Sequence, residues 1–229
     1  MDSFWYFGKN AVPLFTNDMK ELELNWYAVK VFFNKVFELE EKLESMGLES
    51  YIAVQKVQLK GIRHLQAVKK LAQAEQEGHS QDRRFFQEGA ILYERVPLVK
   101  SLLFVRADAN RILEVEALLK PVADASSAKG FIYKTTDWKT FAVIPAKQME
   151  MFRLVTGAGL GGLEFFADDD FTRFKQGDRV RVIDGPLRGA EGYIKRIRKN
   201  RRLLVSIEGV IAVATSYIPP QNLQIVPEA

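Results

Sequence analysis

The sequence predicts an α+β domain, a flexible linker and a small all-β barrel, in that order. Between residues 25 and 156, apolar strand-like segments alternate with segments of helical periodicity, which is typical of helices packed on a sheet. Four glycines lie between residues 157 and 162, and three aspartates follow at 168–170, which predicts a flexible linker. From residue 174 onward, short β-rich segments alternate with Gly, Pro and Asn turns, as in a small barrel.

The first domain opens with a β-rich, largely apolar segment at 26–32, which predicts a central strand. A helix follows, with Asn34 as a candidate N-cap and Gly47 as its C-terminal stop. A second strand covers 49–57. Residues 60–92 are rich in charged and amide side chains and predict an insert, either a helical hairpin or a partly mobile segment. Its expected apolar stripe consists of Ile62, Leu65, Val68 and Ala72.

The rest of the first domain continues the same alternation. An apolar strand is predicted over 96–105, and Asp108 is placed to cap the helix after it. Residues 131–133 and 141–144 predict a hairpin, and Pro145 suits the first turn of a last helix. The domain therefore reads β-α-β-insert-β-α-β-β-α, an arrangement of helices packed on a mostly antiparallel sheet.

Five short strands are predicted for the C-terminal barrel, because each is β-rich and bounded by turn residues. They span 179–183, 192–198, 203–207, 210–214 and 223–225. The turn after the first of them is rich in glycine, which permits positive φ and close approach of two chain segments. We therefore interpret its glycines as structural residues.

The composition excludes several kinds of active site. The chain has no cysteine and only two histidines, so a disulfide framework, a cysteine nucleophile and a multi-histidine metal centre are excluded. No catalytic Ser-His-Asp set, no paired catalytic carboxylates and no nucleotide fingerprint are found. The sequence thus predicts no enzyme, no catalytic or metal-binding residues and no cofactor. It also predicts a cytoplasmic protein without a membrane partner, because no apolar run approaches the roughly 20 residues of a membrane span.

The positive charge is concentrated at the C-terminal end. The whole chain has a formal net charge of +4, but residues 171–229 hold 11 Lys/Arg against 5 Asp/Glu, whereas the rest holds 22 against 24. A basic module favours nucleic acid or an acidic protein surface. The candidate contact residues are six cations in eight positions, namely Lys195, Arg196, Arg198, Lys199, Arg201 and Arg202. The alternative is a solvated hairpin tip. Tyr193 and Tyr217 would stack on bases or belong to the core.

Four stretches carry a resemblance to a known family. The segment Gly177–Ile194 resembles the KOW motif of NusG-type transcription factors and of certain ribosomal proteins. The turn residues that carry this motif are Gly185, Pro186, Gly189 and Gly192. Trp26-Tyr27-Ala28-Val29, the strand at 96–105 and the segment 144–152 resemble, in the expected order, the NGN domain of the same factors. Within that family the chain is most similar to UpxY-type antiterminators of capsular polysaccharide operons.

The resemblance implies an architecture. It consists of an N-terminal extension at 1–24, an NGN-like domain at 25–156 with the insert, a linker at 157–173 and an SH3-like KOW barrel at 174–229. It implies that the NGN domain binds RNA polymerase at the clamp helices of the largest subunit through an apolar patch. By position, the patch would contain Leu102, Phe104, Tyr133 and Met149. Alternation along the strand places Leu102 and Phe104 on one face, which is either the core or the polymerase side.

Three functional hypotheses follow. The first is a specialised elongation or antitermination factor that promotes processive transcription of long polysaccharide operons. Its KOW domain would bind a second partner, which is nascent RNA, a ribosomal protein or a termination factor, and its insert would contact upstream or non-template DNA. The second is a KOW-containing RNA-binding or ribosome-associated protein. The third, an enzyme with an accessory barrel, would need a catalytic set within 25–160, and none is found.

Overall fold

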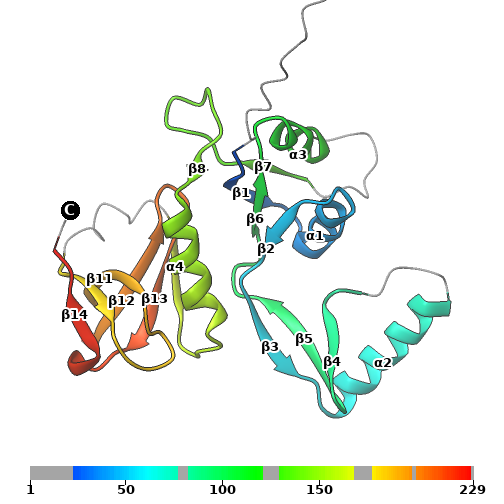
Figure 1. The fold of residues 1–229 in the computed structure, drawn as a ribbon. Coiled ribbons are helices and arrows are strands. Elements are labelled where there is room, and N and C mark those ends of the chain that lie inside the picture. The colour runs from blue at the N-terminus through cyan, green and yellow to red at the C-terminus, as the bar shows by residue number, and fades with distance from the viewer. Residues whose placement is uncertain (1–22, 77–81, 121–128, 168–176, 198–199, 228–229) are drawn as a thin grey trace, which may run out of the picture.

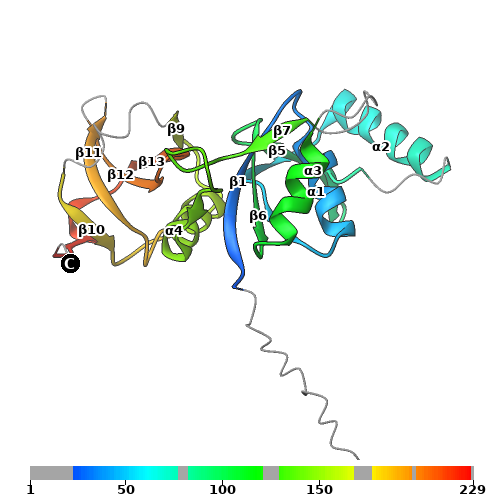
Figure 2. The ribbon, with the colours of Figure 1, turned by 90° about the horizontal axis from the view of Figure 1, so that it is seen from above.

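The computed structural model describes residues 23–76, 82–120, 129–167, 177–197 and 200–227. In these ranges the chain forms a central sheet, a small side sheet, a C-terminal sheet and four helices (Figure 1). Helix α4 lies between the central sheet and the C-terminal sheet, and helix α2 lies at the far end of the side sheet (Figures 1 and 2). The α+β first part and the all-β C-terminal part that the sequence predicts are thereby confirmed.

The central sheet is antiparallel and has β1 in its middle. Its strands are β1 (Asn25–Val31), β2 (Glu49–Tyr51), β6 (Leu102–Ala107), β7 (Gly130–Ile132) and β8 (Val143–Ile144). The order is β2-β6-β1-β7, and β8 also pairs with β1. The apolar run that predicts the first strand is therefore a strand with neighbours on both sides, and its residues Tyr27 to Val29 are buried.

Each face of this sheet is covered by different helices. Helices α1 (Val36–Ser45) and α3 (Arg111–Leu119) pack with Leu103 and Val105 on one face. Helix α4 (Ala146–Gly157) packs on the other, where Leu102 and Phe104 lie. Successive side chains of a strand point to opposite faces, so the two pairs of residues separate. The predicted cap of α3 is present, since Asp108 Oδ1 accepts hydrogen bonds from the backbone N–H groups of the following turn.

In its described residues, the insert contains helix α2, strand β4 and the start of β5 instead of a helical hairpin. Strands β3 (Val54–Gln58), β4 (Phe85–Glu88) and β5 (Ile91–Pro97) form a sheet of order β3-β5-β4, and α2 (Gly61–Gln76) packs on it. The strand predicted over 96–105 is thus divided, because β5 ends at Pro97 and β6 starts five residues later in the central sheet.

The prediction of which residues form the buried side of the insert's helix was wrong. Ile62, Leu65 and Val68 are 74%, 62% and 45% exposed. The inward side is formed by Ala67 and Leu71, which pack with apolar side chains of the side sheet. Residues four apart, such as these two, lie almost directly above one another on a helix, whereas a row spaced by three drifts around it. The pattern alone did not indicate which row the sheet would cover.

The C-terminal sheet contains all five predicted strands. They are β10 (Arg179–Val182), β11 (Glu191–Ile197), β12 (Asn200–Ile207), β13 (Ile211–Tyr217) and β14 (Leu223–Ile225), with a 3-10 helix at Pro220–Asn222. A sixth strand, β9 (Glu164–Ala167), comes from the stretch predicted as linker and pairs with β13. The order is β14-β10-β11-β12-β13-β9. Residues 168–173 of that stretch, like 1–22 of the N-terminal extension, lie outside the described residues.

The glycine-rich turn between β10 and β11 has a direct steric basis. Gly185 and Gly189 have φ of +87° and +91°, which residues with a side chain rarely adopt. At Gly192, a Cβ atom would lie 2.2 Å from the carbonyl oxygen of Leu204 on the neighbouring strand. The turn therefore needs glycine at these positions for its backbone path. Pro186, between the first two glycines, is exposed.

Candidate functional site

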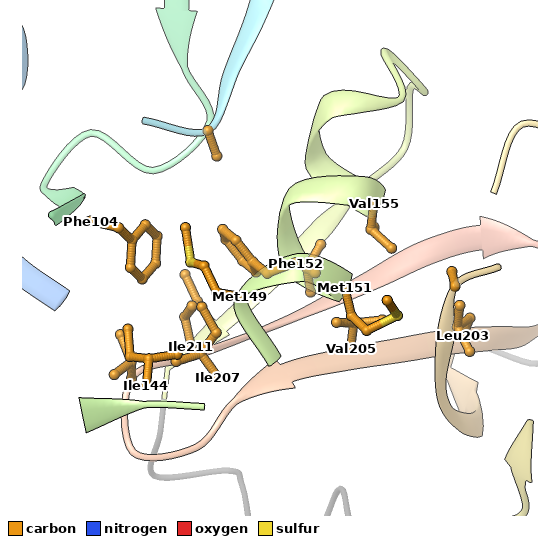
Figure 3. Close-up of a cluster of buried hydrophobic side chains, with 14 of the residues drawn as sticks. Phe104, Ile144, Met149, Met151, Phe152, Val155, Leu203, Val205, Ile207 and Ile211 are labelled. Atoms are coloured by element: carbon orange, nitrogen blue, oxygen red, sulfur yellow. The ribbon is translucent and has the colours of Figure 1, made fainter. Parts of the chain in front are cut away.

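The apolar face of the central sheet lies under α4. Leu102 and Phe104 of β6 are 5% and 1% exposed, and Met149 of α4 is 1% exposed. The rings of Phe104 and Phe152 meet edge to face at 5.3 Å, and Met149 lies beside them (Figure 3). Tyr133 is half-buried against the same cluster. The structure thus brings the four predicted patch residues to one cluster, with three of them buried in this arrangement.

The opposite side of α4 faces the C-terminal sheet. Met151 and Val155 point toward Leu203 and Val205 of β12 (Figure 3). A single apolar cluster therefore runs from the central sheet through α4 into the C-terminal sheet. Helix α4 is a shared layer, and the two parts of the chain are packed together through it.

Polar contacts hold α4 on the central sheet. The hydroxyl groups of Tyr51 and Thr156 are 2.7 Å apart. The Arg153 guanidinium lies over the rings of Trp26 and Tyr51, at 5.4 and 5.2 Å, and forms an ion pair with Glu49 at 3.1 Å. Burial raises the pKa of the Tyr51 hydroxyl, against the hydrogen bond to Thr156 and the charge of Arg153. Aromatic and charged contacts thus add to the apolar packing on this side.

A different kind of contact joins α4 to the C-terminal sheet. The Glu191 side chain is 7% exposed and has Lys147 Nζ of α4 at 2.9 Å. Arg181 and Arg179 of β10 approach the same carboxylate at 2.5 and 3.2 Å. The hydrogen bonds from Lys147 and Arg181 lower the pKa of Glu191 to about 2. Glu191 therefore stays ionised at neutral pH and connects α4 to the sheet electrostatically.

An aromatic row continues the apolar face beyond α4. We use "aromatic row" for Phe33, Phe32, Phe131 and Tyr133, whose successive ring centroids are 6.4, 6.0 and 5.5 Å apart. Phe32, Phe33 and Phe131 are 41%, 77% and 44% exposed. Phe131 lies on the same sheet face as Leu102, because both are paired with Lys30. An exposed cluster of aromatic side chains is a common feature of binding surfaces.

Sequence reasoning did not select the exposed members of this row. Phe32 and Phe33 stand at the end of a strand, where they read as part of the core, and Phe131 was only one residue of a hairpin. The positive φ of Phe33, 59°, is a conformation that a bulky residue rarely adopts, and no sequence pattern reveals it. The sequence offered one signal for Phe131. Alternation along the strand places Phe131 on the same face as Tyr133, which was a predicted contact residue.

The structure separates the predicted basic residues into two groups. Arg196 and Arg201 are directly opposite on β11 and β12, and Lys195 is opposite Arg202 on the other face. Arg202 is largely buried, with Nη1 2.9 Å from Glu164 Oε1 of β9, although without hydrogen-bond geometry. Arg202 thus attaches the edge strand electrostatically. The remaining two predicted cations, at 198–199, lie outside the described residues.

Most of the cations in the insert are neutralised by acids of the same chain. Arg63 pairs with Glu94 at 2.8 Å, and Lys70 and Arg84 pair with Asp82 at 3.2 and 2.6 Å. Arg83 pairs with Glu44. Burial would raise the pKa of Asp82, but the hydrogen bonds from Arg84 and Lys70 outweigh it and lower the pKa to about 2. The field of the insert is therefore weaker than its count of basic residues indicates.

Within the described ranges, no cluster of three or more His, Cys, Asp or Glu could hold a metal ion. None of the described helices combines the length and the apolar character that crossing a membrane would need.

These features define a class of protein: an α+β domain with an apolar sheet face, joined through one helix to a basic β-domain. Residues 24–153 match the family model described as transcription termination factor nusG. Because this match covers more than half of the chain, the protein belongs to the NusG family, whose members are transcription factors.

The chain is similar in structure to the solved structure titled "Domain interaction in Thermotoga maritima NusG". The match covers 90% of this chain and 98% of that chain. Its sequence identity is 16% and its TM-score is 0.40, values that carry no argument about function. No curated protein matches the chain.

Proposed function

We propose that this protein is a specialised NusG-like elongation or antitermination factor that binds RNA polymerase through the face of its central sheet. The predicted contact residues are Leu102, Phe104, Tyr133 and Met149, and the partner is the clamp helices of the largest subunit. The observation that carries the proposal is the aromatic row, which leaves the outer end of this face exposed in a domain that belongs to the NusG family. Exposed aromatic anchors dominate the energetics of such interfaces.

The exposed end of the face offers a first contact for an apolar helix. Phe131 and Phe32 are open to solvent, whereas Leu102 and Met149 lie deeper. A partner that contacts Leu102 must compete with α4, and one that contacts Met149, which lies on α4, must compete with the residues packed against that helix. The packed arrangement and the polymerase-bound one are then two states of one equilibrium. The polymerase shifts this equilibrium only by its preference for the open state.

The cellular role that we propose is processive transcription of long polysaccharide operons, with catalysis by the polymerase and none by this chain. The proposal rests on the similarity to UpxY-type antiterminators in the first strand, in the segment around β6 and in α4. It predicts that deletion of the protein lowers transcripts of distal genes more than those of promoter-proximal genes in one long operon. Equal loss along the operon would contradict it. A ribosome-associated role, the alternative, would not need an apolar face on the central sheet.

Binding of the full chain to core RNA polymerase tests the proposal. Phe131→Asp should abolish the complex in a pull-down at physiological salt, because the substitution places a charge in an apolar contact. Phe131 is a better test than Phe104, since a charge at the buried Phe104 would unfold the domain.

Ile225→Asp is the matched control, because Ile225 is 71% exposed and lies on β14, away from the row. This variant should bind like the wild type. Undiminished binding of Phe131→Asp, or equal loss in both variants, would contradict the proposed face.

A further inference from the structure

We propose that four consecutive aromatic residues near the start of the chain dock on the aromatic row and cover it when no polymerase is bound. These residues, which we call the aromatic segment, are Phe4, Trp5, Tyr6 and Phe7. The inference assigns an occupant to a surface that is exposed in the structure. Its consequence for polymerase binding rests on the proposed function, because the same row is the proposed first contact of the polymerase.

The backbone holds the aromatic row in place. The backbone N–H of Phe32 donates a hydrogen bond of 2.7 Å to the carbonyl oxygen of Lys129, which fixes the end of β1 beside β7. A Cβ atom on Gly130 would lie 2.1 Å from the carbonyl oxygen of Lys30, so glycine is needed for this close approach. The sheet itself therefore brings Phe32 and Phe131 together. A surface that is already ordered loses little freedom when it binds.

The chain turns sharply after β1 and directs Phe33 outward. Phe33 and Asn34 both have positive φ, 59° and 57°. This conformation is costly for a bulky residue, and such outliers cluster at binding and switch regions. Here it places a ring that is 77% exposed at the end of the row. Within the described residues, the row is thus an ordered apolar surface without a cover, and such surfaces mark interaction sites.

The aromatic segment can reach the row. Residues 8–22, fifteen in all, join it to Glu23, the first described residue. Fifteen residues span up to about 50 Å when extended. From Glu23 the chain runs along β1 to Phe33, and these ten further residues span at most about 35 Å. The connection is therefore longer than the path that it has to cover, and docking needs no change in the central sheet.

Chemistry and concentration both favour this occupant. Aromatic rings pack well edge to face or offset against other rings, and the row presents three exposed phenyl rings in series. A segment attached through a short connection has an effective concentration in the millimolar range. A second copy of the protein would need a similar concentration in solution to compete. The row is therefore covered by the segment of its own chain in preference to that of another molecule.

A docked segment competes with the polymerase. Both contact Phe131 and its neighbours in the row, so only molecules with an open row can bind the polymerase. The apparent affinity for polymerase then falls in proportion to the open fraction. Conversely, bound polymerase displaces the segment. The segment thus sets a threshold of polymerase affinity or concentration below which the factor stays unbound.

Distances between two spin labels test the docking without polymerase. The chain has no cysteine, so Ser3→Cys and Lys100→Cys carry the labels without background. Lys100 is exposed and lies near the row, since its neighbour Ser101 accepts a hydrogen bond from the backbone N–H of Val31 at the end of β1. The doubly labelled full chain should show a population of short distances. Dilution with excess unlabelled chain should leave this population unchanged.

Two changes should remove the short distances. One is Phe131→Asp, which places a charge in the apolar contact. The other combines Phe4→Ser, Trp5→Ser, Tyr6→Ser and Phe7→Ser and is called the four-serine variant. Ile225→Asp is the matched control for the charge, because Ile225 is 71% exposed and lies on β14. Phe15→Ser, outside the aromatic segment, is the control for the loss of an aromatic ring. Both controls should keep the short distances.

Three results would overturn the inference. The first is a wild-type chain that shows only long distances. The second is a short-distance population that persists in Phe131→Asp or in the four-serine variant. The third is loss of the short distances on dilution with unlabelled chain, which would show that a second copy supplies the segment.

Polymerase affinity tests the competition. The four-serine variant should bind core RNA polymerase about tenfold more tightly than the wild type, the gain expected if about a tenth of the wild-type molecules have an open row. Phe15→Ser should bind like the wild type. Equal affinity of the four-serine variant and the wild type would overturn the covering of the row. Short distances in the wild type, with no polymerase binding by either chain, would instead overturn the proposed function and leave the docking intact.

Discussion

The two sides of helix α4 differ in how they are attached. Toward the central sheet, Phe152 packs on Phe104, and Arg153 and Thr156 add aromatic and hydroxyl contacts. Toward the C-terminal sheet, apolar packing of Met151 is joined by the ionised Glu191. The first contact depends on shape and apolar area, and the second also depends on charge. We infer that pH and single charges can change the second contact while the first persists.

The largest expected effect is on the central-sheet side. Phe152→Ala should lower the free energy of unfolding by about 3–5 kcal/mol, because it removes a fully buried ring and leaves a cavity between α4 and the sheet. Denaturant titration of the full chain measures this effect. Phe131→Ala, at an exposed aromatic position, should change the free energy by less than about 1 kcal/mol. Similar losses in both variants would show that α4 is not packed as described.

An intermediate effect is expected at Glu191. Glu191→Gln should cost about 1–3 kcal/mol at neutral pH, because it removes the carboxylate that pairs with Lys147 and the two arginines. The folded pKa of Glu191, about 2, lies below its ordinary value of 4.5. Its stabilisation is therefore complete above pH 4.5 and is lost as pH falls through 2.

Urea titrations of the wild type and of Glu191→Gln at several pH values test this sign. The difference in stability between them should shrink as the pH is lowered from 5 toward 2. Asp184→Asn, a change at an exposed carboxyl of the same domain, is the control. A difference that stays constant with pH would rule out the electrostatic role of Glu191.

The smallest effect is expected for Lys147→Met. The side chain is 59% exposed, so its ion pair should contribute less than about 1 kcal/mol to stability. The change should nevertheless broaden the distribution of distances between the two parts of the chain. Because the chain has no cysteine, Ser45→Cys and Gln224→Cys can carry spin labels without background. An unchanged distance distribution would show that apolar packing alone holds the two parts together.

Local patterns predicted the elements whose environment is set by their own sequence. The first strand, the helix capped by Asp108 and the strands of the C-terminal sheet were all anticipated. Prediction failed where a second element decided the outcome. The apolar row of α2 was misplaced because β4 and β5 cover the row with Ala67. Strand β9 was missed because β13 pairs with a segment that has linker composition.

The candidate sites show the same division. Alternation placed Leu102 and Phe104 on one face, but whether this face is covered depends on α4. The run of basic residues at 195–202 could be read directly from the sequence. Its separation into the exposed Arg196 and Arg201 and the largely buried Arg202 depends on strand pairing. The exposure of Tyr217 likewise follows from the register of β12 and β13.

The sequence by itself determined the alternation of strands and helices in the first domain, the concentration of positive charge at the C-terminal end and the glycine turn. These features follow from spacing along the chain and from backbone sterics, which need no distant partner. Only the tertiary structure decided that α4 is shared by two sheets and that the aromatic row stays open. It also decided that Glu191 is enclosed by three cations. Each of these depends on which distant segments pack together, because the groups packed around a side chain set its burial and its pKa.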